Sequence, residues 1–455
     1  MCVDVGSTFT KAALVDPAGG VLIARAAVPT TVPTALRTGV DVLDGVRAAR
    51  AELTAQAGSG VPSITERDRV LLCSSAGGGL RLAVVGYERS VTAEAGGRVG
   101  LSAGAKVVHV AAGPLDQATL TALRAAAPDV VLLVGGTDGG NAQIVLHNAR
   151  RLARARLRAP VVVAANRAAQ GEIGALLAST GRRYVLADNV LPRIGEIAPL
   201  SARRAIREVF LRHVIGGKGL SRGPLFASLV RAATPDAVLA GVQVVATTTG
   251  QDVMVLDVGG ATTDAYSVLT PQGEDAALRK QVVAPMWDAR TVEGDLGMRW
   301  GARSLLQAAR GEGLADAEDP GLQDWVETVS THPARVPTTD AERDRDLTLG
   351  RFACTIAARR HGRPPAPGEP PRPLAEVAYI IGSGGVLRHA DAAAAHSALT
   401  AVTCDHAGGW RPPSEARVEI DTAYLLAPIG LLAADHPELA GALASRLQQD
   451  GSAGR

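Results

Sequence analysis

Cysteine is scarce in this chain, and its four cysteines lie far apart. Cys2, Cys73, Cys354 and Cys404 form no C-x-x-C pair. In a chain of 455 residues, this number and spacing disfavour both a zinc site and a disulfide framework. Cys2 and Cys73 lie in apolar runs, where we expect small buried core residues.

Aromatic residues, net charge and long apolar runs are also low or missing. Phe, Trp and Tyr make up 3% of the residues, which disfavours base stacking as the main activity. The net charge of +2 is too small for binding along a nucleic-acid backbone. No signal peptide is visible, and no apolar run reaches about 18 residues. We therefore expect a cytoplasmic protein that binds neither nucleic acid nor a membrane.

Apolar runs and turn residues divide the chain into five parts. We expect a first lobe at 1–85 that opens with three strands. Residues 86–200 alternate apolar runs with amphipathic helical stretches, which predicts parallel βαβ units in an inserted α/β subdomain. We expect connecting helices and a second lobe at 201–310, and an insertion with a Pro-rich loop at 311–375. A Gly-rich turn and C-terminal helices are expected at 376–455.

Two polar loops of the same design stand far apart in the chain. The first reads VDVGSTFTKAALV, with Asp4 in its second position, and the second reads LDVGGATTDAYSV, with Asp257 in the same place. Turn formation alone would explain one such loop, because Asp, Gly, Ser and Thr favour turns. The repetition indicates two hairpins that hold a polyphosphate from opposite sides, because N–H groups in tight Gly turns bind anions.

The loops carry residue types that suit a magnesium nucleotide. Asp4 and Asp257 are the expected magnesium ligands, through water, and Asp257 is also a candidate for orienting the attacking water. Lys11 is expected to reach a phosphate, and its alternative is a surface lysine on a strand. Asp264 is either a second water-positioning group or a turn residue. Contacts with phosphate are expected from Gly6, Ser7, Thr8, Thr10, Gly259, Gly260, Thr262 and Thr263.

The paired loops resemble the phosphate-1 and phosphate-2 motifs of the superfamily of actin, sugar kinases and heat-shock chaperones. Three more stretches follow in the superfamily's order. TPDAVLAGVQVVA resembles the connecting helix, GDLGMRWGARSLL the Leu-Gly turn and helix, and YIIGSGGVLRHAD the adenosine motif. There, Gly382, Gly384 and Gly385 are expected to let the backbone pass close to base and ribose. The resemblance implies a duplicated actin-like (ribonuclease H-like) ATPase fold, with two lobes around a cleft that binds ATP and Mg²⁺.

Six stretches together resemble the MutL family associated with glutamate mutase, which is unrelated to the mismatch-repair protein of that name. They are VDVGSTFTKAALVD, CSSAGGGLR, VVLLVGGTDGGN, FLRHVIGGKGLS, LDVGGATTDAYSV and RTVEGDLGMR. Membership implies an ATPase that serves as chaperone or reactivating factor for an adenosylcobalamin-dependent mutase such as glutamate mutase. A homo-oligomer is compatible with this reading. The inserted subdomain has no evident role in the nucleotide site, so we expect it to grip the partner.

Other functions stay open at this point. A small-molecule kinase of the same superfamily would need a catalytic Asp in a closed acceptor pocket. A filament-forming actin-like protein would assemble with ATP. A dehydratase activator would need cysteines arranged for an iron–sulfur cluster, which the four cysteines do not suggest.

Three local patterns also have two readings each. The stretch GGTDGG at 135–140 follows an expected strand, and we expect a tight turn in preference to an anion site. Glu293 and Asp295 are either an acid/base pair or part of a loop that contacts ribose or caps the next helix. Arg203, Arg204 and Arg207 lie at near-helical spacing within 201–213, and the face that they form meets either solvent or an acidic partner.

Overall fold

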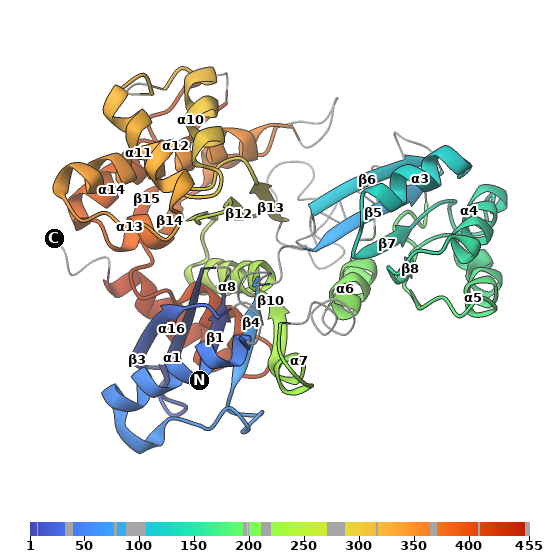
Figure 1. The fold of residues 1–455 in the computed structure, drawn as a ribbon, viewed down its shortest axis with the longest axis horizontal. Coiled ribbons are helices and arrows are strands. Elements are labelled where there is room, and N and C mark those ends of the chain that lie inside the picture. Colours follow the sequence, from blue (N-terminus) through green and yellow to red (C-terminus); the bar gives the residue numbers. More distant parts are fainter. Residues whose placement is uncertain are drawn as a thin grey trace.

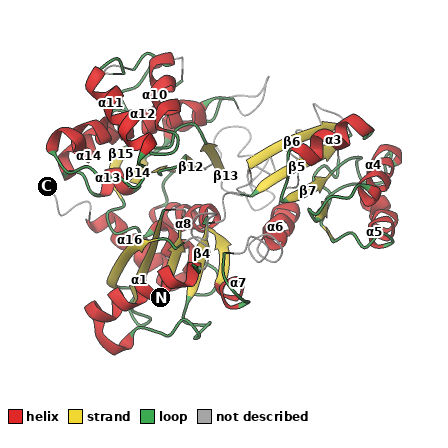
Figure 2. Ribbon diagram, in the orientation of Figure 1, coloured by secondary structure: helices red, strands yellow, loops and turns green. Residues whose placement is uncertain are grey.

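The chain folds into two lobes and an arm. The computed structural model describes residues 1–6, 8–31, 40–76, 80–87, 106–193, 198, 200–210, 220–270, 287–314, 317–364, 371–407 and 410–450. The lobes lie one above the other in Figure 1, and the arm, defined here as residues 81–209, stands to one side of both. Each of the three bodies contains both helices and strands, as Figure 2 shows.

The first lobe is built on a five-stranded sheet of order β10-β4-β1-β2-β3. Its strands are β1 (Cys2–Val5), β2 (Phe9–Val15), β3 (Leu22–Pro29), β4 (Leu71–Ser74) and β10 (Val230–Ala233). β1 to β3 form the predicted antiparallel meander, while β4 and β10 run parallel to β1. Helix α1 (Val42–Ala57) packs on this sheet, and the side chain of Asp41 caps its first turn. A short 3₁₀ turn, η1 (Gly58–Gly60), follows it.

The second lobe repeats this architecture. Its sheet has the order β13-β12-β11-β14-β15, formed by β11 (Val253–Val258), β12 (Thr263–Leu269), β13 (Trp287–Glu293), β14 (Tyr379–Ser383) and β15 (Arg417–Ile420). Its helices are α10 (Ala302–Gly311), α11 (Pro320–Thr331), α12 (Asp340–Gly362), α13 (Gly385–Arg388) and α14 (Ala392–Thr400), with η5 (Leu374–Glu376) before β14. In the strand register, Asp4 lies opposite Lys11 in the first hairpin. Asp257 lies opposite Asp264 at the equivalent place in the second. The predicted duplicated actin-like fold is confirmed.

Two helices cross between the lobes with their backbones in contact. They are α8 (Thr234–Thr249), which follows β10, and α15 (Leu426–Leu432), which follows β15. A Cβ atom at Gly241 would lie 2.1 Å from the carbonyl oxygen of Leu426, and one at Gly430 would lie 1.7 Å from that of Ala237. Only glycine fits at this crossing. The C-terminal helix α16 (Pro437–Asp450) packs beside both helices.

The arm is a parallel α/β unit, as its sequence pattern predicts. Its sheet has the order β6-β5-β7-β8-β9, with strands β5 (Arg81–Gly86), β6 (Lys106–Ala112), β7 (Val130–Leu133), β8 (Val161–Val163) and β9 (Tyr184–Leu186). Its helices are α3 (Gln117–Ala125), α4 (Gln143–Arg154), α5 (Gln170–Ala178) and α6 (Leu200–Val209), with η3 (Arg167–Ala169) before α5.

The boundaries of the arm differ from the sequence-based ones. β5 lies inside the predicted first lobe but pairs with β6 and β7 of the arm. α6 begins where the arm was predicted to end, and it packs on β7, β8 and β9. The chain then returns through α7 (Leu225–Leu229) to β10, which joins the first sheet although its residues were assigned to the second lobe. Periodicity identifies short strands but does not say which sheet receives them.

The cysteines, the possible metal ligands and the helices of the described residues bear on what was inferred from composition. Cys2 and Cys73 are buried and unpaired, as expected of core residues. Among the described residues, no three His, Cys, Asp or Glu side chains gather into a metal-binding cluster. No helix in that part of the chain has the length and apolarity needed to span a bilayer.

Candidate functional site

The two polar loops form the same hairpin. The N–H of Gly6 donates to the carbonyl of Phe9 at 3.0 Å, and the N–H of Gly259 donates to that of Thr262 at 2.9 Å. A Cβ atom on either glycine would lie 2.8 Å from the same carbonyl oxygen. Each turn therefore needs glycine at this position. The two similar sequences form turns of the same geometry.

The tips of the hairpins face one another. A Cβ atom at Gly260 would lie 3.7 Å from the hydroxyl oxygen of Thr8, so the tips come from different lobes to within contact distance. The N–H groups of Thr8, Gly260 and Ala261 have no hydrogen-bond partner among the described residues. Such N–H groups at tight turns attract anions. Ser7 lies outside the described residues.

Asp4 is buried at the end of β1 and is held from two sides. Its Oδ1 accepts a hydrogen bond of 2.5 Å from the hydroxyl of Thr234 and one of 3.6 Å from the thiol of Cys73. Ala233 takes the cap position of α8, and the helix begins at Thr234. The helix that connects the lobes thus begins with a direct contact to the candidate site.

Asp257 occupies the equivalent position in the second lobe. Burial raises the pKa of this carboxyl to about 6, and the nearby carboxylates of Asp264 and Asp4 push it in the same direction. Lys11 and a hydrogen bond from Ser383 oppose the shift. A divalent cation between the lobes would relieve the repulsion among these carboxylates. The residues present therefore fit a hydrated Mg²⁺.

Lys11 points into the space between the lobes. Its Nζ lies 3.9 Å from Oδ2 of Asp4 and 3.3 Å from the ring centroid of Tyr424, which lies between β15 of the second lobe and the crossing helix α15. Burial lowers the pKa of Lys11, while Asp4 and Asp257 raise it. The alternative of a surface lysine is wrong, because its side chain is only 24% exposed and contacts Asp4 and the ring of Tyr424. Tyr424 has φ +60°, an uncommon conformation for a non-glycine residue.

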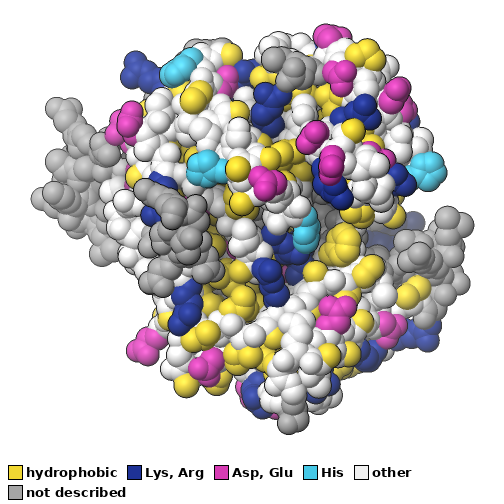
Figure 3. Space-filling model, turned by 90° about the vertical axis from the view of Figure 1, so that its left-hand side faces the viewer, with side chains coloured by type: hydrophobic (Ala, Val, Ile, Leu, Met, Phe, Trp, Pro, Cys, Tyr) yellow, Lys and Arg dark blue, Asp and Glu magenta, His cyan; other side chains and the backbone are white. Residues whose placement is uncertain are grey.

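A cavity of about 270 Å³ opens beside Lys11 between the two lobes. Arg25 of the first lobe and Arg388 of the second line it, and Nη1 of Arg25 donates to the carbonyl of Thr422 at 2.7 Å. The guanidinium of Arg388 lies 5.7 Å from the ring centroid of Tyr424. Figure 3 shows basic and histidine side chains at the furrow between the lobes. Three cations, Lys11, Arg25 and Arg388, line the cavity together with two carboxylates, Asp4 and Glu52, so its lining has a small excess of positive charge.

Two predicted phosphate-binding hydroxyls face the interior instead. The hydroxyl of Thr10 hydrogen-bonds that of Thr30 at 3.0 Å, and the hydroxyl of Thr263 donates to the carbonyl of Leu296 at 2.7 Å. Both threonines are fully buried. Their side chains brace the hairpins, which corrects the expected contact with phosphate. The register matches Thr10 with Thr263, whereas Thr8 corresponds to Ala261 and not to Thr262.

The Leu-Gly stretch after β13 holds the second hairpin in place. The N–H of Met298 donates to the carbonyl of Gly259 at 3.0 Å, and that of Arg299 donates to the carbonyl of Gly260 at 2.8 Å. A Cβ atom at Gly297 would lie 2.3 Å from the carbonyl oxygen of Ala261. This stretch therefore packs backbone against backbone on the hairpin. The side chain of Thr262 donates within the hairpin, to Asp264 at 3.3 Å.

The three glycines of the adenosine motif differ in their surroundings. Gly382 lies inside β14, where a Cβ atom would meet Leu387 and Leu399 at 2.8 Å, so packing requires this glycine. Gly384 has φ +110°, and a Cβ atom there would lie 2.2 Å from the carbonyl oxygen of Val258. Gly385 is exposed at the start of α13. Gly384 and Gly385 therefore remain candidates for backbone contact with a ligand, whereas Gly382 supports the strand.

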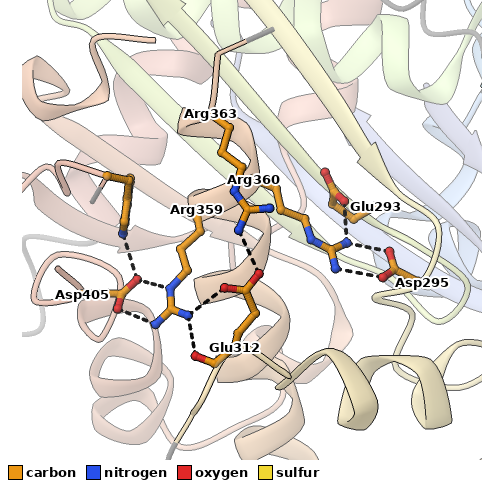
Figure 4. A network of polar contacts seen from close by, with 8 residues as sticks. Glu293, Asp295, Glu312, Arg359, Arg360, Arg363 and Asp405 are labelled. Carbon is orange, nitrogen blue, oxygen red and sulfur yellow. Dashed lines mark hydrogen bonds and ion pairs between the residues drawn. The ribbon is translucent and has the colours of Figure 1, made fainter. Parts of the chain in front are cut away.

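Glu293 and Asp295 are bound to an arginine of α12. Nη1 of Arg360 lies 2.9 Å from Oε2 of Glu293 and 2.8 Å from Oδ1 of Asp295. Figure 4 shows this contact beside the parallel pairing of Arg359 with Asp405. The hydrogen bonds from Arg360 lower the pKa of Asp295, whereas burial raises the pKa of Glu293. The geometry favours the reading of this pair as part of the loop.

Polar side chains of the arm hydrogen-bond the turn at 135–140. The side chain of Asn166 accepts from the N–H of Gly139 at 3.2 Å and donates to the carbonyl of Gly140 at 2.9 Å. Asn189 donates to Asp138 at 2.8 Å. These contacts support the expected tight turn over an anion site.

The chain is similar to known proteins in sequence and in structure. A family model described as "MutL protein" matches residues 1–447. Protein MutL of Clostridium tetanomorphum is 32% identical over 459 residues, covering 97% of each chain. A nucleotide-free acetone carboxylase structure is 11% identical with a TM-score of 0.41, covering 95% of this chain and 70% of that one. Xylulose kinase of Bifidobacterium adolescentis is 12% identical with a TM-score of 0.30, covering 98% and 92%.

Proposed function

The chain belongs to the MutL family, and on that premise we propose that it binds Mg²⁺-ATP between its lobes, hydrolyses it, and uses the cycle to remodel a partner protein. One observation carries the proposal. Two hairpins of the same geometry face each other from different lobes, each with a carboxylate at its base, and their tips present unpartnered N–H groups among the described residues. This arrangement suits the phosphate chain of a nucleotide from both sides.

The residues divide the chemistry between the lobes. Asp4 and Asp257 would hold the water shell of Mg²⁺, and the ion would supply charge neutralisation for the phosphates. Lys11 would exchange the Tyr424 ring for a phosphate oxygen, a stronger partner for an ammonium group than an aromatic face. Asp257 would orient the attacking water. Its pKa of about 6 is near the value that suits proton transfer at neutral pH.

The partner we propose is an adenosylcobalamin-dependent mutase such as glutamate mutase, which the arm grips. This step rests on the family resemblance and on the separation of the arm from the nucleotide site, visible in Figure 1. By the same proposal, ATP and ADP favour different lobe angles, because only ATP has a γ-phosphate for both hairpins to hold. Movement of the arm would then open the mutase for exchange of damaged cobalamin.

Helix α6 supplies the mechanical link that this proposal requires. Nη2 of Arg203 lies 2.9 Å from Oδ2 of Asp288 on β13 of the second lobe, in an ion pair that is largely buried. Nε of Arg207 lies 2.8 Å from Oδ2 of Asp236 on α8, the connecting helix. The acidic partner considered for these arginines is thus within the same chain. A rotation of the second lobe would pull on the arm through α6.

We expect calorimetric titration to show ATP binding that depends on Mg²⁺ and weakens in acid. Asp257 has a raised pKa, so below about pH 6 it holds a proton that a bound cation must displace. Affinity should fall about tenfold per pH unit below pH 6, and this dependence should be absent above pH 7. Asp257→Asn should bind more weakly at pH 7 and lose this acid-side slope.

The control for the titration is the difference between variants, because the nucleotide itself titrates in this range. Subtracting the pH profile of Asp257→Asn from that of the wild type isolates the carboxyl. Unchanged ATP binding in both Asp4→Ala and Asp257→Ala would refute the assignment of the hairpins. Turnover that appears only with a small hydroxyl-bearing acceptor would favour the kinase reading.

Arg203→Ala should uncouple the arm from the nucleotide. We expect the ATP-induced change in distance between the arm and the second lobe to disappear, while ATP affinity stays within about twofold, because only the link is cut. The distance can be measured between probes on the exposed Cys404 and on a cysteine introduced as Ser179→Cys at the exposed end of α5. Arg150→Ala removes an ion pair with Glu172 within the arm and is the matched control. A full distance change in Arg203→Ala would contradict the link.

A further inference from the structure

The arm is far more basic than the rest of the chain. Residues 106–193 contain 11 Lys and Arg residues against 5 Asp and Glu residues, a net charge of +6. The whole chain has 47 against 45, so the remainder carries 36 against 40 and is net acidic. The stretch RRLARARLR at 150–158 has five arginines and no carboxylate. Positive charge is therefore concentrated in the arm.

The topology of the arm brings these charges to one edge. Its five strands run parallel, so the helices end at the edge where the strands begin. Arg124 lies in the last turn of α3, Arg154 ends α4, and Arg156 and Arg158 lie between α4 and β8. We call these four residues the arginine edge.

The arginine edge is exposed, and its positive charges are not neutralised by ion pairs among the described residues. All four side chains are exposed, and none has an ion-pair partner among the described residues. A cation at a helix C-terminus offsets the helix dipole, which accounts for Arg124 and Arg154. Arg156 and Arg158 lie beyond the end of α4 and have no such role.

Two other arginines make this surface rigid. Nη2 of Arg182 donates to the carbonyl of Ala155 at 2.9 Å, and its Nη1 donates to that of Leu157. Nη2 of Arg81 donates to the carbonyl of Ala126 at 2.8 Å. These side chains turn inward and tie the loops that carry the exposed arginines. A preformed surface loses less conformational entropy on binding than a loose one.

We propose that the arginine edge docks an acidic surface of a partner protein. The inference rests on the proposed role of the arm, and it names the chemistry of the surface that the arm would grip. Arginine is enriched at protein interfaces and pairs with carboxylates in a bidentate geometry. The exposed large apolar side chains described in the arm, Val110 and Leu186, lie toward the ends of β6 and β9 and away from this edge. The edge as described thus lacks the apolar contacts of a membrane anchor and the aromatic rings that stack on bases.

The test uses the full chain with Arg154→Glu, Arg156→Glu and Arg158→Glu combined. Binding of a fluorescein-labelled poly-glutamate peptide is followed by anisotropy at several salt concentrations. We expect the wild type to bind the peptide with an affinity that falls as salt rises, and the triple variant to bind at least about tenfold more weakly. The matched control replaces three exposed arginines of the lobes, Arg47, Arg69 and Arg343, with glutamate, and should bind within about twofold of the wild type.

Two further measurements distinguish docking of an acidic protein surface from misfolding of the variant and from binding to DNA or to a membrane. A second triple variant with glutamine at the same arm positions should also lose binding, and both variants should keep the circular dichroism spectrum of the wild type. Equal loss in the arm and control variants would overturn the proposal, as would tighter binding of the wild type to duplex DNA or to phosphatidylserine vesicles. ATP titration is run in parallel. Failure of the wild type to bind ATP would count against the nucleotide site and leave the peptide result to decide on the edge.

Discussion

Gly430→Ala is expected to destabilise the protein by about 3 kcal/mol, because α8 and α15 have no room for a side chain where they cross. The new Cβ atom would lie 1.7 Å from the carbonyl oxygen of Ala237 and 2.7 Å from the backbone nitrogen of Gly241. Backbone atoms cannot change rotamer to make space. The helices must therefore separate, and the apolar residues packed around them lose contact. The change can be measured as the midpoint of urea unfolding.

The control for this substitution lies in the neighbouring helix. A Cβ atom added at Gly441 in α16 would meet nothing within 4 Å, so Gly441→Ala should leave stability unchanged or raise it by a few tenths of a kcal/mol. An equal loss of stability in both variants would show that the crossing has no special demand for glycine. Because the same helices join the lobes, Gly430→Ala should also weaken nucleotide binding.

Lys11→Met should reduce ATP turnover by about 100-fold or more while leaving the fold intact. The methionine keeps an apolar stem of similar length against the ring of Tyr424 but removes the charge between Asp4 and the phosphates. Because this charge matters more as negative charge develops on the leaving group, kcat should fall further than KM rises. Steady-state phosphate release with and without Mg²⁺ measures both.

Arg47→Met is the matched control, since Arg47 is an exposed cation of the same lobe with an ion pair to Asp44. Its turnover should match that of the wild type. Lys11→Arg keeps the charge but presents a bulkier, planar group, and should recover part of the activity. A Lys11→Met enzyme with full turnover would remove Lys11 from the phosphate site.

Much of the fold follows from local patterns in the chain. The strands that carry Asp4 and Asp257 could be predicted because each is a short apolar run, interrupted only by the aspartate, that ends at a glycine turn. The arm could be predicted because its apolar runs alternate with amphipathic helices. β10 and β15 were missed, since their sequences VRAA and RVEI are not apolar runs and their places in the sheets depend on distant strands. The same limit explains why β5 was assigned to the first lobe.

The hairpins of the candidate site could also be predicted, but not the residues that surround them. Arg25 and Tyr424 lie outside the motifs, and Thr234 is the first residue of the connecting-helix stretch, but the types of these residues alone carry no signal for a site. They matter because the crossing helices and the β2–β3 meander bring them to Lys11 and Asp4. Conversely, Thr10 and Thr263 have the hydroxyl group expected of a phosphate contact, but strand alternation turns both side chains toward the interior.

Because the two sheets correspond residue by residue, their side chains can be compared at equivalent positions. This comparison bears on the orientation of a ligand between the lobes. In a perfectly twofold molecule, a ligand would find the same charges after half a turn. Here Lys11 stands where the other lobe has Asp264, and Arg25 stands where it has Arg290. Arg290 is already neutralised by Asp264 at 2.7 Å, whereas Arg25 faces the cavity and donates to a carbonyl. The duplication has thus kept the scaffold but not the charges, so an anionic ligand meets different side chains on the two lobes and has a preferred orientation in the cleft.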